Sequence, residues 1–207
     1  MTSTYTTNLG IEKITTGDQA GTWGNTTNTN FDIIDQAING IGSSTLTSSH
    51  TSSGGALAIA ITDGAVSAGR NAFIEFSDGG DIGGTGYVQL TPNNAEKILY
   101  VRNSLSASRS VIIFQGTYNA SNDFELANGK DAVIKFSGGG SGATVTQVFA
   151  DLTATNITAP LTGNVTGNVT GNVTGAVTGN VTGDLTGAVT GNATGNLTGN
   201  VTSTGTS

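Results

Sequence analysis

Three acidic side chains lie close together in the middle of the chain, at Glu75, Asp78 and Asp81. Two carboxylates on either side of a glycosidic bond can hydrolyse it, and two carboxylates with free carbonyl oxygens can bind Ca²⁺. Asp78 and Asp81, however, belong to the run Asp78-Gly-Gly-Asp-Ile-Gly-Gly, and aspartate is common in glycine-rich turns because its side chain bonds the nearby backbone. We therefore interpret this run as a plain turn, and expect neither a catalytic pair nor a metal site there.

No other arrangement of reactive residues points to an enzyme. The single histidine, His50, lies among Ser and Thr, which is typical of a solvated loop, and no cysteine is present to form a disulfide or a thiolate metal site. Phosphate-binding, zinc and dinucleotide motifs are not found in the sequence. We expect no catalytic residue, no cofactor and no metal, and hence no enzymatic activity.

Composition restricts the partners. The chain has 207 residues, a net charge of −7 and a pI near 4.3, which argues against binding to nucleic-acid phosphates. The first residues lack the basic and apolar regions of a secretory signal, and no apolar run has transmembrane length. We therefore expect a protein made in a cytoplasm that does not insert into a membrane. With 32 glycines and only 10% charged residues, the composition favours a β-rich or fibrous structure.

The C-terminal part repeats an apolar residue, Thr, Gly and usually Asn, with a period of four residues. In an extended chain this period places the apolar residue and Gly on one face, and Thr and Asn on the other. Gly, Val and Thr are weak helix formers, so the repeat does not favour an α-helix. Ala193 keeps the register together with the larger apolar residues, which are Leu161, Val165, Val169, Val173, Val177, Val181, Leu185, Val189, Leu197 and Val201.

A single copy of this repeat is not expected to be stable alone. Burying each Val or Leu gives roughly 1.5–3 kcal/mol, whereas ordering each residue costs about 1–2 kcal/mol of backbone entropy. Identical neighbours would share the apolar stripe, and glycine would allow the backbones to approach. We therefore predict a shaft in which three copies turn these residues toward a common axis. The alternative, which the Gly/Thr/Asn composition also permits, is a disordered polar tail.

The N-terminal part is expected to contain one short helix. Phe31, Ile34 and Ile38 follow at helical spacing, with Thr29 and Asp32 in a pattern similar to a capping box. The predicted helix spans about residues 30–39, and ten residues are marginal in isolation, so its apolar face needs a partner. The only tryptophan, Trp23, lies between Thr22 and Gly24, in a setting that favours an interface anchor.

The middle of the chain shows the pattern of a β domain. Short apolar runs of alternating character are separated by Gly, Asn, Asp and Ser turns. Their spacing predicts a small antiparallel sandwich or jelly roll. The expected strands are Leu57–Ile61, Ala72–Phe76, Tyr87–Leu90, Ile98–Arg102, Val111–Phe114, Phe124–Leu126, Ala132–Phe136 and Val145–Phe149.

Two stretches resemble a known group of proteins. The run from Gly10 to Gly24 (Gly-Ile-Glu-Lys-Ile-Thr-Thr-Gly-Asp-Gln-Ala-Gly-Thr-Trp-Gly) and the run from Asn28 to Asn39 resemble the N-terminal segment of tail fibres and other tail structural proteins of marine tailed bacteriophages, such as cyanophages and pelagiphages. The four-residue repeat resembles repeats of the same group. The two segments together cover under half the chain. The resemblance implies a trimeric fibre whose N-terminus attaches to the virion and whose distal part faces the host.

The sequence therefore predicts a mainly β structural protein of a virion tail. Its expected parts are an attachment segment at 1–42, a linker at 43–55, a β-sandwich at 56–151 and a repeat shaft at 152–207, assembled as an intertwined homotrimer. Tail proteins (nozzle, adaptor or hub) and a host-surface glycan are its expected partners, and its tail-docking residues are Trp23, Phe31, Ile34 and Ile38. Two alternatives remain: a nozzle or adaptor component, and a carbohydrate-binding or carbohydrate-degrading tail spike.

Overall fold

The computed structural model describes residues 4–150. The chain divides into two units, residues 1–156 and 157–207, and the description below concerns the first. The predicted shaft, with its axis residues from Leu161 to Val201, lies outside the described residues. Within the described part the fold is mainly β with one α-helix, as the sequence predicts.

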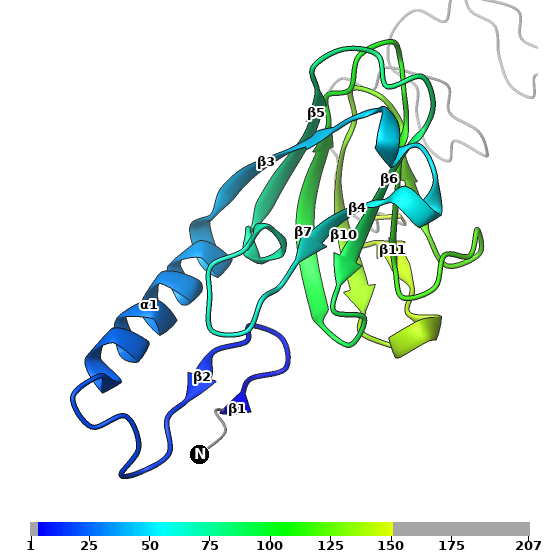
Figure 1. Ribbon diagram of the computed structural model, residues 1–207. Coiled ribbons are helices and arrows are strands. Elements are labelled where there is room, and N and C mark those ends of the chain that lie inside the picture. The colour runs from blue at the N-terminus through cyan, green and yellow to red at the C-terminus, as the bar shows by residue number, and fades with distance from the viewer. Residues whose placement is uncertain (1–3, 151–207) are drawn as a thin grey trace, which may run out of the picture. The chain divides into compact units, whose positions relative to one another are not determined.

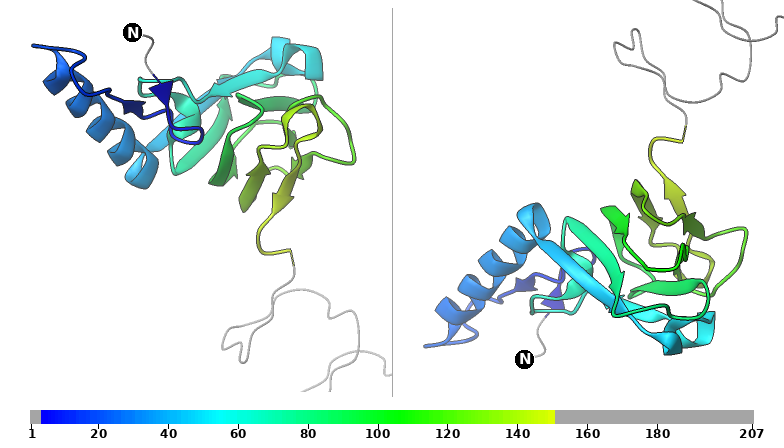
Figure 2. Two further views of the ribbon diagram at one scale, coloured as in Figure 1. Left: turned by 90° about the horizontal axis from the view of Figure 1, so that it is seen from below. Right: turned by 90° about the horizontal axis from the view of Figure 1, so that it is seen from above.

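The N-terminal segment forms a small hairpin followed by the helix. Strand β1 (Thr4–Tyr5) pairs antiparallel with β2 (Glu12–Lys13), and helix α1 spans Trp23–Asn39. In Figures 1 and 2 the helix extends away from the sheets and lies beside this hairpin. The hairpin and the helix both precede β3 (Ile41–Leu46), the first strand of the β domain, in the sequence.

The prediction that the helix begins near residue 30 is wrong. The helix begins at Trp23, Thr29 lies inside it, and its N-cap is Thr22, which makes no side-chain capping bond. The first turn contains glycine, asparagine and threonine. These are weak helix formers, so the sequence does not predict that the helix begins there. Tertiary hydrogen bonds compensate, because the Thr26 hydroxyl donates to Gln19 Oε1 over 2.5 Å and Gln19 in turn donates to Glu12.

Within residues 4–150, nine further strands form two sheets that enclose one core. All eight strands expected from the sequence are present, with ends that differ by a few residues. The five-stranded sheet has the order β11 (Val145–Gln147), β10 (Asp131–Ser137), β7 (Glu96–Asn103), β5 (Phe73–Asp78) and β3 (Ile41–Leu46). The four-stranded sheet has the order β4 (Leu57–Ala60), β6 (Gly86–Thr91), β8 (Val111–Gln115) and β9 (Phe124–Leu126).

The predicted antiparallel sandwich is wrong in its strand pairing. From β3 to β8, consecutive strands alternate between the two sheets, so each strand pairs in parallel with the one two places earlier. The chain therefore coils through both sheets, and the labels of Figure 1 allow this course to be followed from β3 through β4, β5 and β6 to β7. Only β9, β10 and β11 close the coil with antiparallel pairs. A two-residue hairpin cannot join parallel strands, and the long connections here provide the required crossovers.

The linker predicted at 43–55 is also replaced by regular structure. Residues Ile41–Leu46 form β3, the edge strand of the five-stranded sheet, followed by 3₁₀ turns at Ser48–His50 and Ser53–Gly55. A Ser- and Thr-rich strand is stable here because β5 supplies its backbone partners from Phe73 to Asp78. Composition alone does not reveal such a neighbour.

The core lies between the two sheets. The buried side chains alternate along each strand with exposed ones, as expected for strands with one face in the interior. The largest contributors are Leu46, Ile59, Ile74, Phe76, Leu90, Leu99, Ile113, Ile134 and Phe136, all nearly or fully buried.

Candidate interaction surface

Helix α1 is held to the rest of the domain by one buried apolar residue and by several polar side chains. Its only buried residue is Ile33. Beside it, the Asn30 amide donates from Nδ2 to the Glu12 carbonyl oxygen over 2.9 Å and accepts from the Glu12 amide at 3.0 Å. Asn30 therefore pairs with the backbone of β2 as a neighbouring strand would, and fixes the hairpin against the helix.

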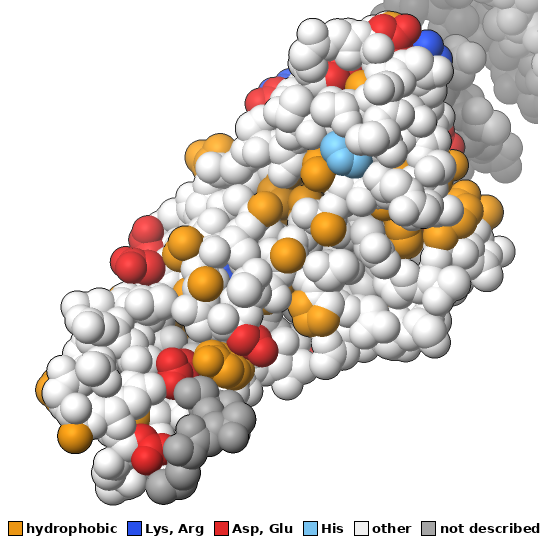
Figure 3. Space-filling model, in the orientation of Figure 1, with side chains coloured by type: hydrophobic (Ala, Val, Ile, Leu, Met, Phe, Trp, Pro, Cys, Tyr) orange, Lys and Arg blue, Asp and Glu red, His pale blue; other side chains and the backbone are white. Residues whose placement is uncertain are grey.

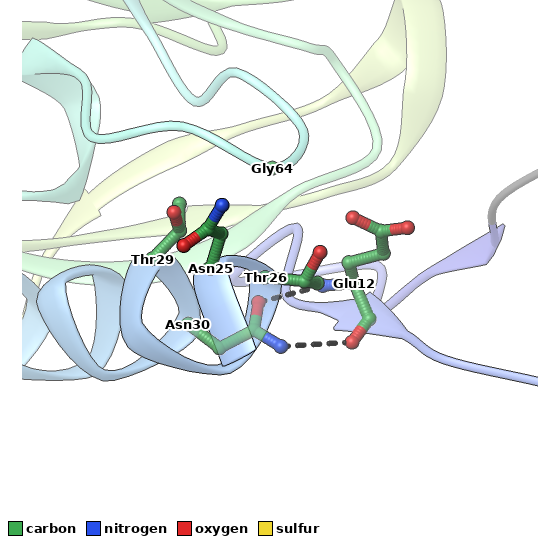
Figure 4. A pocket seen from close by; sticks show the side chains of 6 residues that line it. All are labelled: Glu12, Asn25, Thr26, Thr29, Asn30 and Gly64. Atoms are coloured by element: carbon green, nitrogen blue, oxygen red, sulfur yellow. Dashed lines mark hydrogen bonds between the residues drawn. The ribbon is translucent and has the colours of Figure 1, made fainter. Parts of the chain in front are cut away.

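A pocket of about 200 Å³ lies next to this contact. Figure 4 shows the two Asn30 bonds to Glu12 at its edge, with the other lining residues on the helix and at Gly64. Ligand sites are usually larger, at roughly 300–1,000 Å³, and mostly apolar. Because this pocket is small, is lined by hydroxyl, amide and carboxylate groups, and has its central amide already bonded, we interpret it as part of the helix attachment.

The C-terminal half of the helix is attached in the same way. Gln36 donates from Nε2 to Asn71 Oδ1 over 3.1 Å, and its Oε1 accepts from the Ser67 amide at 3.0 Å. The Gly40 amide then donates to the Gln36 carbonyl and ends the helix. Sequence reasoning did not identify Asn30 and Gln36. The available signal was their placement next to Ile33 and Ala37 on one helical face.

The solvent-exposed part of the helix carries an apolar strip among polar residues, and this strip is uncovered within residues 4–150. Trp23, Phe31 and Ile38 expose 61%, 62% and 65% of their surface, and Ile34 is half-buried. Each is one of the predicted tail-docking residues, and the structure places Phe31, Ile34 and Ile38 together along this side with Trp23 in the first turn. An amphipathic helix normally buries its apolar side. Here Ile33 is the one apolar residue of the helix that is fully buried, while Trp23, Phe31 and Ile38 remain exposed.

The N-terminal segment is also anchored at a buried arginine. The Arg70 guanidinium is fully buried and donates to the carbonyl oxygens of Ala65 and Thr62. The backbone of Gly10 passes next to this guanidinium with φ +55°. A Cβ at this position would lie 2.7 Å from Arg70 Nη2 and 2.6 Å from Asp63 Oδ1. Only glycine fits this conformation and this close approach.

A half-buried lysine lies against the same arginine. Lys97 donates from Nζ to the Arg70 carbonyl oxygen over 3.0 Å. Burial and, to a smaller extent, the charge of Arg70 lower the pKa of Lys97 to about 8. The Lys97 ammonium therefore has a structural hydrogen bond to the backbone, and it lies on the inner side of β7 with its neighbour Leu99 in the core.

The acidic residues of the Gly-rich turn are engaged by side chains and backbone of the same domain. Asp81 accepts two bonds from the Arg109 guanidinium, at 2.8 and 3.0 Å, and one from the Gly83 amide. The Arg109 bond and then the Gly83 bond lower the pKa of Asp81 to about 2. Asp78 accepts from the Ser106 amide and hydroxyl, and Glu75 accepts from a serine hydroxyl at 2.5 Å. These carboxylates are used to fix loops.

Other chemistry-bearing residues do not gather into a site. Among residues 4–150, no group of three or more His, Cys, Asp and Glu side chains could hold a metal ion. His50 caps its own 3₁₀ turn by accepting the Thr47 amide at Nδ1. Figure 3 shows the histidine at the surface, with the acidic side chains of that face spread out rather than gathered around it. No helix in the described range is long and apolar enough to cross a membrane.

Comparison with known proteins gives no relative. No protein-family model, curated protein or solved structure significantly matches the chain.

Proposed function

We propose that the chain is a structural subunit of a bacteriophage tail fibre, which forms a homotrimer, docks on a tail protein through its N-terminal part and projects a host-recognition surface. The proposal involves no catalysis. It combines the sequence resemblance of residues 10–39 to marine phage tail proteins with the arrangement of helix α1. The expected location is the tail of a virion, assembled in the host cytoplasm.

The observation that carries the docking step is the orientation of helix α1. Its polar side is bonded to the domain through Asn30 and Gln36, while Trp23, Phe31 and Ile38 remain exposed on a helix of 17 residues. Contiguous exposed apolar side chains on a soluble domain mark interaction sites. Because this surface belongs to the segment that resembles virion-attachment ends, a tail protein with a complementary apolar groove is the partner that we propose for it.

The decisive experiment locates the protein on particles. Antibodies raised against residues 41–150 should label the tail of purified virions of the phage that encodes the chain, as seen by electron microscopy. Labelling confined to the capsid, or no chain in the particles by mass spectrometry, would refute the proposal. Labelling within the tail tube region rather than on a projecting rod would favour the nozzle or adaptor alternative.

The docking step has its own test with matched variants. Phe31→Asp combined with Ile38→Asp should abolish incorporation into particles, because each aspartate introduces a charge into the proposed apolar contact. The control is Asn28→Asp, which changes an exposed polar residue of the same helix. Both proteins should keep the far-ultraviolet circular dichroism of the parent. Normal incorporation of the double variant would refute docking through this side of the helix.

A further inference from the structure

The outer face of the five-stranded sheet carries a row of apolar side chains that crosses β3, β5, β7 and β10 and ends just after β11. The pairing register places Ile41 of β3 beside Phe73 of β5, Phe73 beside Tyr100 of β7, and Tyr100 beside Val133 of β10. The Val148 amide donates to the Val133 carbonyl over 2.8 Å, so the row continues past β11. We name these five residues the outer row.

The side chains of the outer row are much more exposed than those of the core. Ile41 exposes 81% of its surface and Tyr100 exposes 42%, while Phe73 and Val133 are half-buried. The rings of Phe73 and Tyr100 touch at a centroid distance of 5.4 Å. Two more exposed apolar residues, Ile98 and Phe149, lie beside or just after the row. A soluble domain rarely leaves such an arrangement in water unless it binds something.

We infer that the outer row is the contact between copies of this chain in the β domain, with three parallel copies turning the row toward one axis. The inference rests on the proposed homotrimer and says which surface of the β domain it uses. The row runs perpendicular to the strands, along the direction in which neighbouring strands pair. If the three-fold axis of a parallel trimer runs in the same direction, each residue of the row lies at the same height as its counterparts in the other two copies.

Charges on either side of the row suit such an arrangement. On β10, Val133 lies in the row, with Asp131 on one side of it and Lys135 on the other. In a cyclic assembly one side of each copy faces the opposite side of the next, at the same strand. Asp131 of one copy would therefore lie opposite Lys135 of its neighbour. Within one copy, Asp131 also forms an ion pair with Arg102, its neighbour on β7, with 3.4 Å between Asp131 Oδ1 and Arg102 Nε.

The outer face of the sheet is too small to form a standard interface alone, so other parts of the chain would have to contribute to the contact. Five strands about 4.8 Å apart and about six residues long give a face of roughly 24 by 20 Å. That is on the order of 500 Å² before the relief of the side chains, against about 800 Å² from each partner in a standard interface. The proposed shaft at 152–207 would supply the rest, so a contact map tests the inference more directly than mass alone.

The chain contains no cysteine, so single introduced thiols report proximity without background. Full-length Tyr100→Cys, treated with a short bismaleimide, should give a covalent dimer on a denaturing gel. Ala58→Cys is the control, because Ala58 is exposed on the outer face of the four-stranded sheet. It should stay monomeric on the gel.

A second set of variants tests the cyclic geometry. The double variant Asp131→Cys, Lys135→Cys should give a covalent trimer, because each thiol would link to the opposite flank of a neighbour. Either single variant should give no covalent product. Dimers of both single variants would indicate a two-fold arrangement and would overturn the cyclic assignment.

The mass of the untreated chain in solution separates this inference from the proposed function. If light scattering gives a trimer but Tyr100→Cys reacts freely with a bulky maleimide and does not cross-link, the outer row is not the contact, and the trimer stands. If the chain is a monomer, the inference and the homotrimer both fail. A monomer in which the same thiol is protected would show that the chain's own C-terminal segment covers the row.

Discussion

The two sheets share one core, but their outer faces differ. On the four-stranded sheet, Tyr118 from the loop after β8 lies against Tyr87 and Phe114, with ring centroids 5.5 Å away in both contacts. Phe114 is thereby buried although it points away from the core. On the five-stranded sheet, Tyr100 and its neighbours in the outer row have no such cover among residues 4–150. Apolar residues that the chain covers itself stabilise one subunit, whereas uncovered ones are available for association.

The largest expected effect is the breaking of association by a charge in the outer row. Val133→Asp should lower the stability of the homotrimer by about 3–5 kcal/mol for each carboxylate left unpaired in the contact. Sedimentation over a dilution series measures this as dissociation at much higher concentration than for the parent. Ala58→Asp, on the other sheet, should sediment as the parent does. Equal dissociation of the two variants would remove the difference between the faces.

Helix α1 allows the same comparison between a covered and an uncovered side. Ile33→Ala should weaken docking of the helix on the domain by about 3 kcal/mol, because a fully buried side chain is truncated. Hydrogen exchange of the helix amides measures this local opening. Phe31→Ala, on the exposed side, should change their protection by less than about 0.5 kcal/mol. A larger effect at Phe31 than at Ile33 would contradict the assignment of the two sides.

Removing the aromatic cover of the four-stranded sheet should affect the single subunit. Tyr118→Ala is expected to lower the free energy of unfolding by about 2 kcal/mol, from lost burial and two edge-to-face ring contacts. Urea denaturation of the full chain at fixed protein concentration measures it, and cross-linking at Tyr100→Cys should be unaffected. A Tyr118→Phe variant retains the ring contacts and serves as the matched control.

The smallest expected effect depends on pH and concerns the same cover. Burial, and then repulsion by Glu125, raise the pKa of Asp123, while a hydrogen bond from Tyr118 acts in the opposite direction. A raised pKa means that the folded state binds more protons than the unfolded state between the two pKa values, so Asp123 lowers stability as pH rises through this range. Asp123→Asn should therefore be more stable than the parent at pH 7, by a few tenths of a kcal/mol, because solvent still screens this half-buried group.

The prediction for Asp123→Asn is tested by comparing the stability of the variant with that of the parent at two pH values. Below the ordinary aspartate pKa of about 3.9, both states of the parent are protonated, and the difference between variant and parent should disappear. Urea midpoints at pH 3 and pH 7 measure it. A stability gain of Asp123→Asn over the parent that is larger at pH 3 than at pH 7 would contradict the prediction.

The sequence by itself determined where eight strands of the β domain lie, from β4 to β11, but not the Ser- and Thr-rich strand β3. Alternation of side chains is local, so the runs around Ile74, Leu99 and Ile134 indicated strands correctly without any knowledge of their partners. The apolar residues Trp23, Phe31 and Ile38 were likewise recognised as candidates for a contact from their types and spacing. The start of the helix was missed because Gly24 to Asn28 are weak helix formers, and only distant partners such as Gln19 stabilise them.

Tertiary structure decided how the strands pair and which side of each element is left uncovered. Nothing local to Phe73 or Tyr100 specifies that they lie side by side, because parallel pairing joins segments separated by a whole turn through the other sheet. The outer row exists only through this register. The polar attachment of α1 has the same origin, since Asn30 becomes an anchor only when the backbone of Glu12 is folded against it.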